Sequence, residues 1–293
     1  MLLFDSVRKY GWTGLVGTQP NGHNYFVDAN HAQALDANDG VHGQTWETPF
    51  ATITYAITRS NVDGNVYGMN NIYVNAATYS AALTILPKNC NIIGVGARTR
   101  ITGANTVVAA ANNCHFWNIW FRGSGAYPII TLPNATYGGG FHGCRFEGTA
   151  SVTYAISLGM TNDFVIEDCV FQGNPLAPVA IDITAYQLRL QIRRNWIGAT
   201  TSGIQIFNGT GCYGNIIADN YISRLSSDPN SSLQMAYGIK MLKTTGTSKY
   251  LIVNNRIEAV DAIYSATSDT AFQNQCIGNI VVQAGSSVFE DAI

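Results

Sequence analysis

A small residue recurs at nearly constant spacing through the middle of this chain of 293 residues. The positions are Gly96, Gly123, Gly148, Gly173, Gly198 and Ser223, separated first by 27 residues and then by 25 each time. The segments before them also repeat, as in NIWFRG, GCRFEG and DCVFQG. A fixed period of this length predicts a stack of repeats, in which each unit buries its apolar face only against its neighbours.

Two short apolar alternations recur within each repeat. Phe164-Val165-Ile166 exemplifies one and Ala180-Ile181-Asp182-Ile183 the other. Alternation with a period of two predicts half-buried strands, and residues 80–293 contain no long helical stripe. The sequence therefore predicts an all-β fold, a single-stranded parallel β-helix of about eight coils with about 25 residues in each coil.

Stacking equivalent positions of the repeats predicts two inward rows. One row reads Cys144, Cys169, Asn195, Asn220, Asn255 and Asn279, and the other reads Phe121, Phe146, Phe171, Ile197, Ile222 and Ile257. Asparagines at the same turn of successive coils can pass amide hydrogen bonds along the stack. We expect both rows to hold the coils together rather than to take part in chemistry.

A different pattern precedes the repeats. Thr48 is predicted to be a helix N-cap and Pro49 the first helical residue, with Phe50, Ile53 and Ile57 on one face. Such a helix would cover the open apolar end of the first coil. The predicted organisation is a docking arm over 1–23, a cap over 24–70, the β-helix over 71–283 and a tail over 284–293.

Five segments of the chain resemble the pectin-lyase-like superfamily of right-handed parallel β-helices. They are YFVD (25–28), NDG (38–40), ETPFATITYAI (47–57), NIYVNAATYSAALTI (71–85) and NCNIIGVGARTRITG (89–103). The resemblance implies a right-handed helix with an N-terminal capping helix. It does not choose an activity, because the superfamily includes polysaccharide lyases, glycoside hydrolases, bacteriophage tailspikes and non-enzymatic surface proteins.

Composition excludes several classes of partner. The net charge is −2 and 12% of residues are charged, so a basic stripe for nucleic acid is not expected. No stretch approaches 18 apolar residues, and the first residues lack the apolar region of a secretion signal, so we expect no membrane contact. The six cysteines are expected to be free thiols in a chain made in a reducing cytoplasm. No cofactor and no metal site is predicted.

One outward row supplies the candidates for catalysis. It reads Ser157, Asp182, Gln205, Lys240 and Tyr264 and is expected to be a solvated face. A glycoside hydrolase needs two carboxylates, and a lyase needs acidic calcium ligands with a base. The row offers one acid, Asp182, and one base, Lys240, two coils or ~9.6 Å apart. They are the catalytic candidates if the chain is an enzyme, a question that the sequence leaves open.

Two further outward rows are predicted. Asp168, Arg194, Asp219 and Asn254, flanked by Glu167 and Arg193, predict ion pairs between coils. Arg145, Val170, Trp196, Tyr221 and Arg256 place two stacked aromatics between arginines. That arrangement suits either a sugar ring or a subunit contact.

Together these features favour a structural or adsorption component of a bacteriophage virion, resembling a tailspike, a fibre or a capsid-decorating protein. We expect a homotrimer that joins other virion proteins through residues 1–23 and binds host surface polysaccharide. The alternatives are a polysaccharide lyase or glycoside hydrolase, and a non-catalytic carbohydrate-binding module. An insertion at 226–235 lengthens one repeat and is a second place where binding could occur.

Overall fold

The structure is a computed structural model that describes a large part of the chain. The described residues are 22–63, 69–80, 83, 88–95, 98–106, 112–123, 125–133, 136–148, 152–173, 177–207, 212–224, 235–242, 248–265 and 275–282. Residues 1–21 of the predicted arm, 226–234 of the insertion and the tail 284–293 lie outside them.

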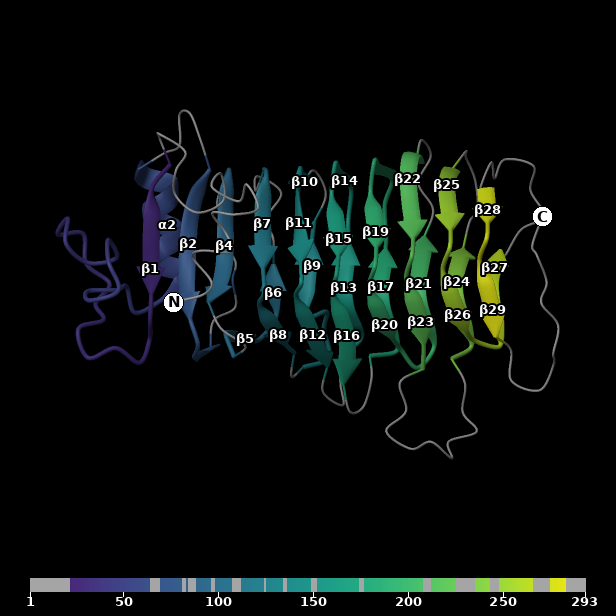
Figure 1. Ribbon diagram of the computed structural model, residues 1–293, viewed down its shortest axis with the longest axis horizontal. Helices are drawn as coiled ribbons and strands as arrows, with labels where there is room; N and C mark the ends of the chain where they lie inside the picture. The colour runs from purple at the N-terminus through teal and green to yellow at the C-terminus, as the bar shows by residue number, and fades with distance from the viewer. Residues whose placement is uncertain are drawn as a thin grey trace.

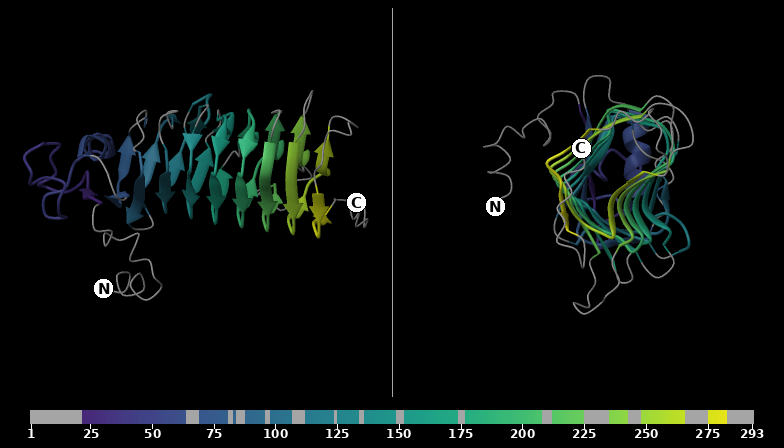
Figure 2. Two further views of the ribbon diagram at one scale, coloured as in Figure 1. Left: turned by 90° about the horizontal axis from the view of Figure 1, so that it is seen from above. Right: turned by 90° about the vertical axis from the view of Figure 1, so that its right-hand side faces the viewer.

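The described strands wind into a right-handed parallel β-helix, as the sequence predicted (Figure 1). Each strand pairs in parallel with the equivalent strands of the coils before and after it, and the pairs build three long sheets. The view along the axis shows the strands of successive coils lying behind one another (Figure 2). The buried apolar side chains fill the interior as one continuous core.

The three sheets have the following strands. The first sheet contains β1 (Asn24–Val27), β2 (Asn70–Asn75), β4 (Cys90–Val95), β7 (Cys114–Trp117), β11 (Gly139–His142), β15 (Val165–Glu167), β19 (Gln191–Arg193), β22 (Cys212–Ala218), β25 (Ser248–Val253) and β28 (Gln275–Ile277), joined through β22 by β18 (Gln187–Leu188), β14 (Thr161–Asn162) and β10 (Thr136–Tyr137). The second sheet contains β3 (Thr78–Ser80), β5 (Arg100–Thr102), β8 (Trp120–Arg122), β12 (Arg145–Gly148), β16 (Val170–Gly173), β20 (Trp196–Gly198), β23 (Tyr221–Ser223), β26 (Arg256–Glu258) and β29 (Ile280–Val282). The third sheet contains β6 (Asn105–Thr106), β9 (Ile130–Leu132), β13 (Tyr154–Leu158), β17 (Val179–Ile183), β21 (Ser202–Phe207), β24 (Tyr237–Leu242) and β27 (Asp261–Ser265).

The strand register shows that two of the glycines used to recognise the repeat are not at equivalent positions. Thr102 pairs with Arg122, so the residue equivalent to Gly123 is Gly103 rather than Gly96. Residues 91–95, which precede Gly96, lie in β4 of the first sheet, whereas Gly148 and Gly173 end strands of the second sheet. Gly198 is also one place early, because Phe171 pairs with Ile197. The repeat length therefore varies between coils, and the large apolar residues mark the register better than the glycines do.

The predicted apolar and asparagine rows are both confirmed. Phe121, Phe146, Phe171, Ile197, Ile222 and Ile257 pair in succession inside the second sheet. In the asparagine ladder, defined as Asn195, Asn220, Asn255 and Asn279, each Oδ1 accepts from the backbone N–H of the preceding row member, Cys169 included, at 2.9–3.0 Å. Cys144 and Cys169 continue the row as free, buried thiols.

The corner between the first and second sheets explains why these side chains turn inward. In seven successive coils one residue has a positive φ there: Asn118, Gly143, Asp168, Arg194, Asp219, Asn254 and Gly278, with φ between 54° and 63°. This left-handed conformation bends the chain sharply from the first sheet into the second. The residue that follows it in each of the later coils is a ladder asparagine, which faces the core.

The cap helix α2 (Ile53–Asp63) covers the start of the β-helix beside β1 and β2 (Figure 1). Ile53 and Ile57 are buried in the core, as predicted. The predicted N-cap at Thr48 is wrong, because Thr52 Oγ1 accepts the N–H of Tyr55 at 3.2 Å. Asp36 fixes this start by accepting the N–H groups of Ala51 and Thr52. The helix therefore has its N-cap at Thr52, four residues after the predicted Thr48, because the distant side chain of Asp36 binds the backbone there.

No helix within the described residues combines the length and the apolar character needed to cross a membrane.

Candidate functional site

The outward side chains form columns along the axis, because successive coils pair in register. On the third sheet the column reads Thr131, Ser157, Asp182, Gln205, Lys240 and Tyr264. The structure thus places the two catalytic candidates, Asp182 and Lys240, in one column with Gln205 between them, as the sequence predicted.

Asp182 is nevertheless not part of a solvated face. Its side chain is buried, with 3% of its surface exposed, and Gln205 Nε2 donates to its Oδ1 at 3.2 Å. Burial raises the pKa of Asp182, and the hydrogen bond from Gln205 opposes that rise only in part. The prediction of an exposed row is wrong here, since Asp182 and its neighbour Gln205 are both buried.

Lys240 contacts the ring of Tyr237, and no ion pair joins it to Asp182 within the described residues. Its Nζ lies 4.3 Å from the ring centroid of Tyr237, and that ring lies 4.9 Å from Tyr264. Among the described members of this column, Asp182 is the single carboxylate. The column therefore offers one desolvated acid and one cation, without the second carboxylate that glycoside hydrolysis requires.

The second sheet carries the aromatic column. It reads Arg100, Trp120, Arg145, Val170, Trp196, Tyr221 and Arg256. The four residues predicted as a carbohydrate or interface site, Arg145, Trp196, Tyr221 and Arg256, all belong to it. Sequence reasoning missed Arg100, because the mistaken equivalence of Gly96 hid the coil that contains it. It also left out Trp120, although NIWFRG was already aligned with GCRFEG; aligning RITG with WFRG would have revealed both residues.

Two parts of this column differ in geometry. Trp120 is held between two guanidinium groups, with Arg100 at 4.0 Å and Arg145 at 4.2 Å from its ring centroid. Trp196 is 46% exposed and meets Tyr221 edge to face at 5.9 Å between ring centroids. The first part is closed by its own arginines, whereas the Trp196 ring is open to a ligand.

Charged groups border the open part of the column. Arg256 lies 5.6 Å from the Tyr221 ring centroid and also pairs with Glu258 at 2.9 Å. An exposed indole beside a tyrosine and an arginine can stack on a sugar ring and pair with its acidic substituents.

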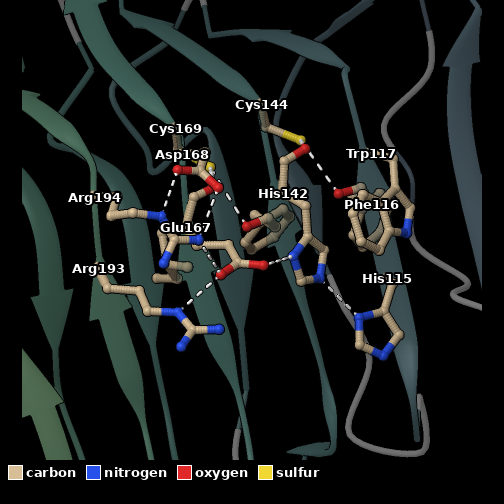
Figure 3. Close-up of polar contacts among 12 residues, drawn as sticks. His115, Phe116, Trp117, His142, Cys144, Glu167, Asp168, Cys169, Arg193 and Arg194 are labelled. Carbon is tan, nitrogen blue, oxygen red and sulfur yellow. Dashed lines mark hydrogen bonds and ion pairs between the residues drawn. The ribbon is translucent and has the colours of Figure 1, made fainter. Parts of the chain in front are cut away.

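The first sheet holds a polar network that the sequence revealed only in part (Figure 3). Glu167 Oε2 accepts from Arg193 Nε and from Arg194 Nη2, each at 2.8 Å. Its Oε1 lies 2.8 Å from His142 Nδ1, and His142 Nε2 lies 2.9 Å from His115 Nδ1. The predicted ion pairs are confirmed for Arg194 with Asp168, at 2.9 Å, and for Arg193 with Glu167, at 2.8 Å, but not for Asp219, which pairs with no cation among the described residues.

The two histidines of this network were missed. His115 and His142 are 27 residues apart, and the register places His115 beside Gly140, so that the two side chains meet diagonally across two strands. A search for like residues at equivalent positions cannot find a diagonal pair. Burial is the main cause of the low pKa of both rings: it lowers the pKa of His115 to about 4, and for His142 it outweighs the opposing charge of Glu167.

Comparisons with known proteins support the fold. No family model matches the sequence, and no curated protein matches it. A pectin methylesterase mutant solved with a hexasaccharide has a TM-score of 0.57 at 12% identity, over 92% of this chain and 92% of that chain. An Aspergillus niger pectin methylesterase has a TM-score of 0.48 at 15% identity, over 85% and 90%. A tailspike of E. coli bacteriophage HK620 has a TM-score of 0.44 at 11% identity, over 73% and 54%. The first of these matches supports the right-handed parallel β-helix fold of this chain.

Proposed function

We propose that this chain is an adsorption protein of a bacteriophage virion that holds acidic host-surface glycans on the outward face of its second sheet. The observation that carries the proposal is the exposed Trp196 ring, 46% accessible, beside Tyr221, whose own ring lies 5.6 Å from the guanidinium group of Arg256 on the next coil. An indole of this exposure offers a sugar ring a flat apolar surface, and arginine supplies paired donors for a carboxylate.

The third sheet supports the proposal that the protein binds glycans without cleaving them. The catalytic candidate Asp182 is buried and has no second carboxylate in its column among the described residues. We further propose that the protein is a homotrimer whose residues 1–23 dock on another virion protein. Light scattering of the full chain tests the trimer, and a monomer at every concentration would contradict it.

Binding of purified bacterial surface polysaccharides to the immobilised protein tests the glycan site. Trp196→Ala with Tyr221→Ala is expected to abolish retention of any glycan that the wild type holds. Tyr213→Ala is the matched control, because Tyr213 is 47% exposed, is an aromatic near a cation (Lys249), and lies on a different sheet. Undiminished retention by the double variant would show that this face is not the glycan site.

A polysaccharide lyase or glycoside hydrolase is the second candidate. It is favoured by the raised pKa of the buried Asp182, the pattern expected of a carboxyl that acts as an acid. Under this alternative Asp182→Asn abolishes depolymerisation of a bacterial polysaccharide while the protein remains folded. Absence of depolymerisation by the wild type, together with retention that depends on Trp196, would reject the enzyme.

A further inference from the structure

Three arginines gather around Trp120 on the outward face of the second sheet. Arg100 comes from β5 and Arg145 from β12, the coils on either side of β8 (Figure 1), and their guanidinium carbons lie 4.0 and 4.2 Å from the centre of the Trp120 ring. Arg122 follows Trp120 by two residues on the same strand, so both project from the same face. We call Arg100, Arg122 and Arg145 the arginine cluster.

The arginine cluster carries more positive charge than its surroundings neutralise. The charged residues of β5, β8, β12 and β16 are the three arginines and Glu147, which leaves a net charge of +2 in a chain whose net charge is −2. Glu147 is shared, because its two oxygens lie 3.6 Å from Arg122 Nε and 3.5 Å from Arg145 Nη2. Among the described residues Arg100 has no carboxylate partner.

The same place holds three buried donors that lack an acceptor. They are Arg100 Nε, Trp120 Nε1 and Arg122 Nε, and none of them has a hydrogen-bond partner among the described residues. They belong to two adjacent strands, because Arg100 pairs with Trp120 in register. Buried polar groups are normally hydrogen-bonded, and an unsatisfied one is unfavourable. The cluster is therefore short of acceptors, and an anion would supply them.

Stacking on Trp120 leaves the donors of the flanking arginines available. The N–H groups of a guanidinium lie in its plane, so a ring against its face does not use them. The side chains of Arg122 and Arg145 are each 43% exposed, and Arg100 is half-buried. Arg145 is partly satisfied, because Gln172 Oε1 accepts from its Nε at 2.7 Å when the amide oxygen faces the guanidinium. Arg100 and Arg122 are thus the arginines with the most unused donors.

We propose that the arginine cluster binds the phosphate monoester group of a ligand, with Arg100 and Arg122 as its direct contacts. The two residues are diagonal neighbours, since Thr102, two residues after Arg100, pairs with Arg122. Their Cα atoms are therefore about 8 Å apart, which lets two long side chains meet at one group. Arg145 adds charge and holds Trp120 from the other side.

The charge of the cluster favours a phosphate monoester over a carboxylate. A phosphate monoester carries about −1.5 to −2 charges at pH 7, which matches the net charge of +2, and its terminal oxygens can accept from two guanidinium groups at once. A carboxylate carries one charge, and Glu147 already supplies one without neutralising the cluster.

The cluster lies in the same outward column as the proposed glycan site. Trp120 and Trp196 are three coils apart, through Arg145 and Val170, or ~14 Å by strand spacing. The inference deepens the proposed function, and rests on it, where it says that the acidic glycan carries phosphate monoesters. Binding of a small phosphate monoester does not depend on that function, so each of the two can fail without the other.

Titration of the full-length chain with glucose 6-phosphate tests the site, with calorimetry in low-salt buffer at pH 7.5 as the readout. We expect one equivalent to bind, and Arg100→Gln and Arg122→Gln each to weaken binding about tenfold or more. Arg189→Gln is the matched control, because it removes the same charge from an exposed ion pair with Asp163, away from the second sheet. The proposal is overturned if the wild type does not bind at millimolar ligand, or if the control loses as much affinity as the cluster variants.

The charge of the ligand gives an independent readout. The second pKa of a phosphate monoester is about 6, whereas arginine stays charged, and the described strands of the second sheet contain no histidine. Affinity for glucose 6-phosphate should therefore fall between pH 7.5 and pH 5, while affinity for inorganic sulfate should not change. An affinity for glucose 6-phosphate that is the same at both pH values would contradict a site built for two negative charges.

Retention of a phosphorylated mannan by the immobilised protein decides which ligand carries the phosphate. Removal of the phosphate by alkaline phosphatase should reduce retention as much as Arg100→Gln does. Binding of glucose 6-phosphate without retention of the mannan would keep the site, assign it to a soluble sugar phosphate and count against the glycan function. Retention that survives phosphatase treatment but is lost in Trp196→Ala with Tyr221→Ala would support the glycan function and reject the phosphate.

Discussion

Replacement of Asn220 by alanine tests whether the asparagine ladder holds the coils together. Asn220 is 2% exposed, and its side chain makes four hydrogen bonds. Its Oδ1 accepts from Asn195 N and Asn195 Nδ2 at 3.0 Å, and its Nδ2 donates to Ile192 O and Asn255 Oδ1 at 2.9 Å. Alanine leaves the backbone N–H of Asn195 and the carbonyl of Ile192 buried without these partners.

The size of the effect follows from those orphaned groups. A buried donor or acceptor left unsatisfied costs about 1–3 kcal/mol, so Asn220→Ala is expected to lower the free energy of unfolding by about 2–4 kcal/mol. Asn279 is the matched control: it makes the same kinds of bonds at the last described coil, where it is only half-buried. Water can replace its bonds, so Asn279→Ala should cost at most about 1 kcal/mol.

Urea unfolding followed by far-ultraviolet circular dichroism measures both variants. Because a solenoid is stabilised coil by coil, the loss in Asn220→Ala should also raise hydrogen exchange locally, at the amides of Asn195 and its neighbours. Equal losses in the two variants, or a loss under 1 kcal/mol at Asn220, would refute the reasoning that burial makes the ladder strong.

Two other predictions concern the core and the buried acid. Cys169→Asn should raise the free energy of unfolding by about 0–1 kcal/mol, because the new amide extends the asparagine ladder by one coil. Its Nδ2 can donate to Phe141 O, which the Cys169 thiol already faces at 3.5 Å. A loss above about 1 kcal/mol in urea unfolding would show that the site cannot hold the amide. Asp182→Asn should be more stable than the wild type at pH 7. Burial raises the pKa of Asp182 in the folded state above its ordinary value of 3.8. The neutral carboxyl therefore contributes its full stability below pH 3.8, and this contribution is lost as the pH rises through the folded-state pKa. The two proteins should therefore differ least at pH 3 in thermal unfolding, and a difference that does not grow with pH would contradict the assignment.

The sequence by itself determined the fold and its inward rows. Phe146, Phe171 and Ile197 mark the coils because an interior position must be apolar in every repeat, and the ladder asparagines recur because each needs the one before it. Such constraints repeat with the coil, so one sequence displays them several times.

The tertiary structure decided what the outward face does. The burial of Asp182, the helix start at Thr52 and the meeting of His115 with His142 each depend on residues from other coils or loops. Repeat lengths differ between coils, so the outward neighbours of a side chain follow from the register of each turn and not from a fixed spacing. The pattern of core residues recurs in every repeat and can therefore be recognised in the sequence. Each contact on the surface occurs at a single place in the molecule and depends on how two particular coils are aligned.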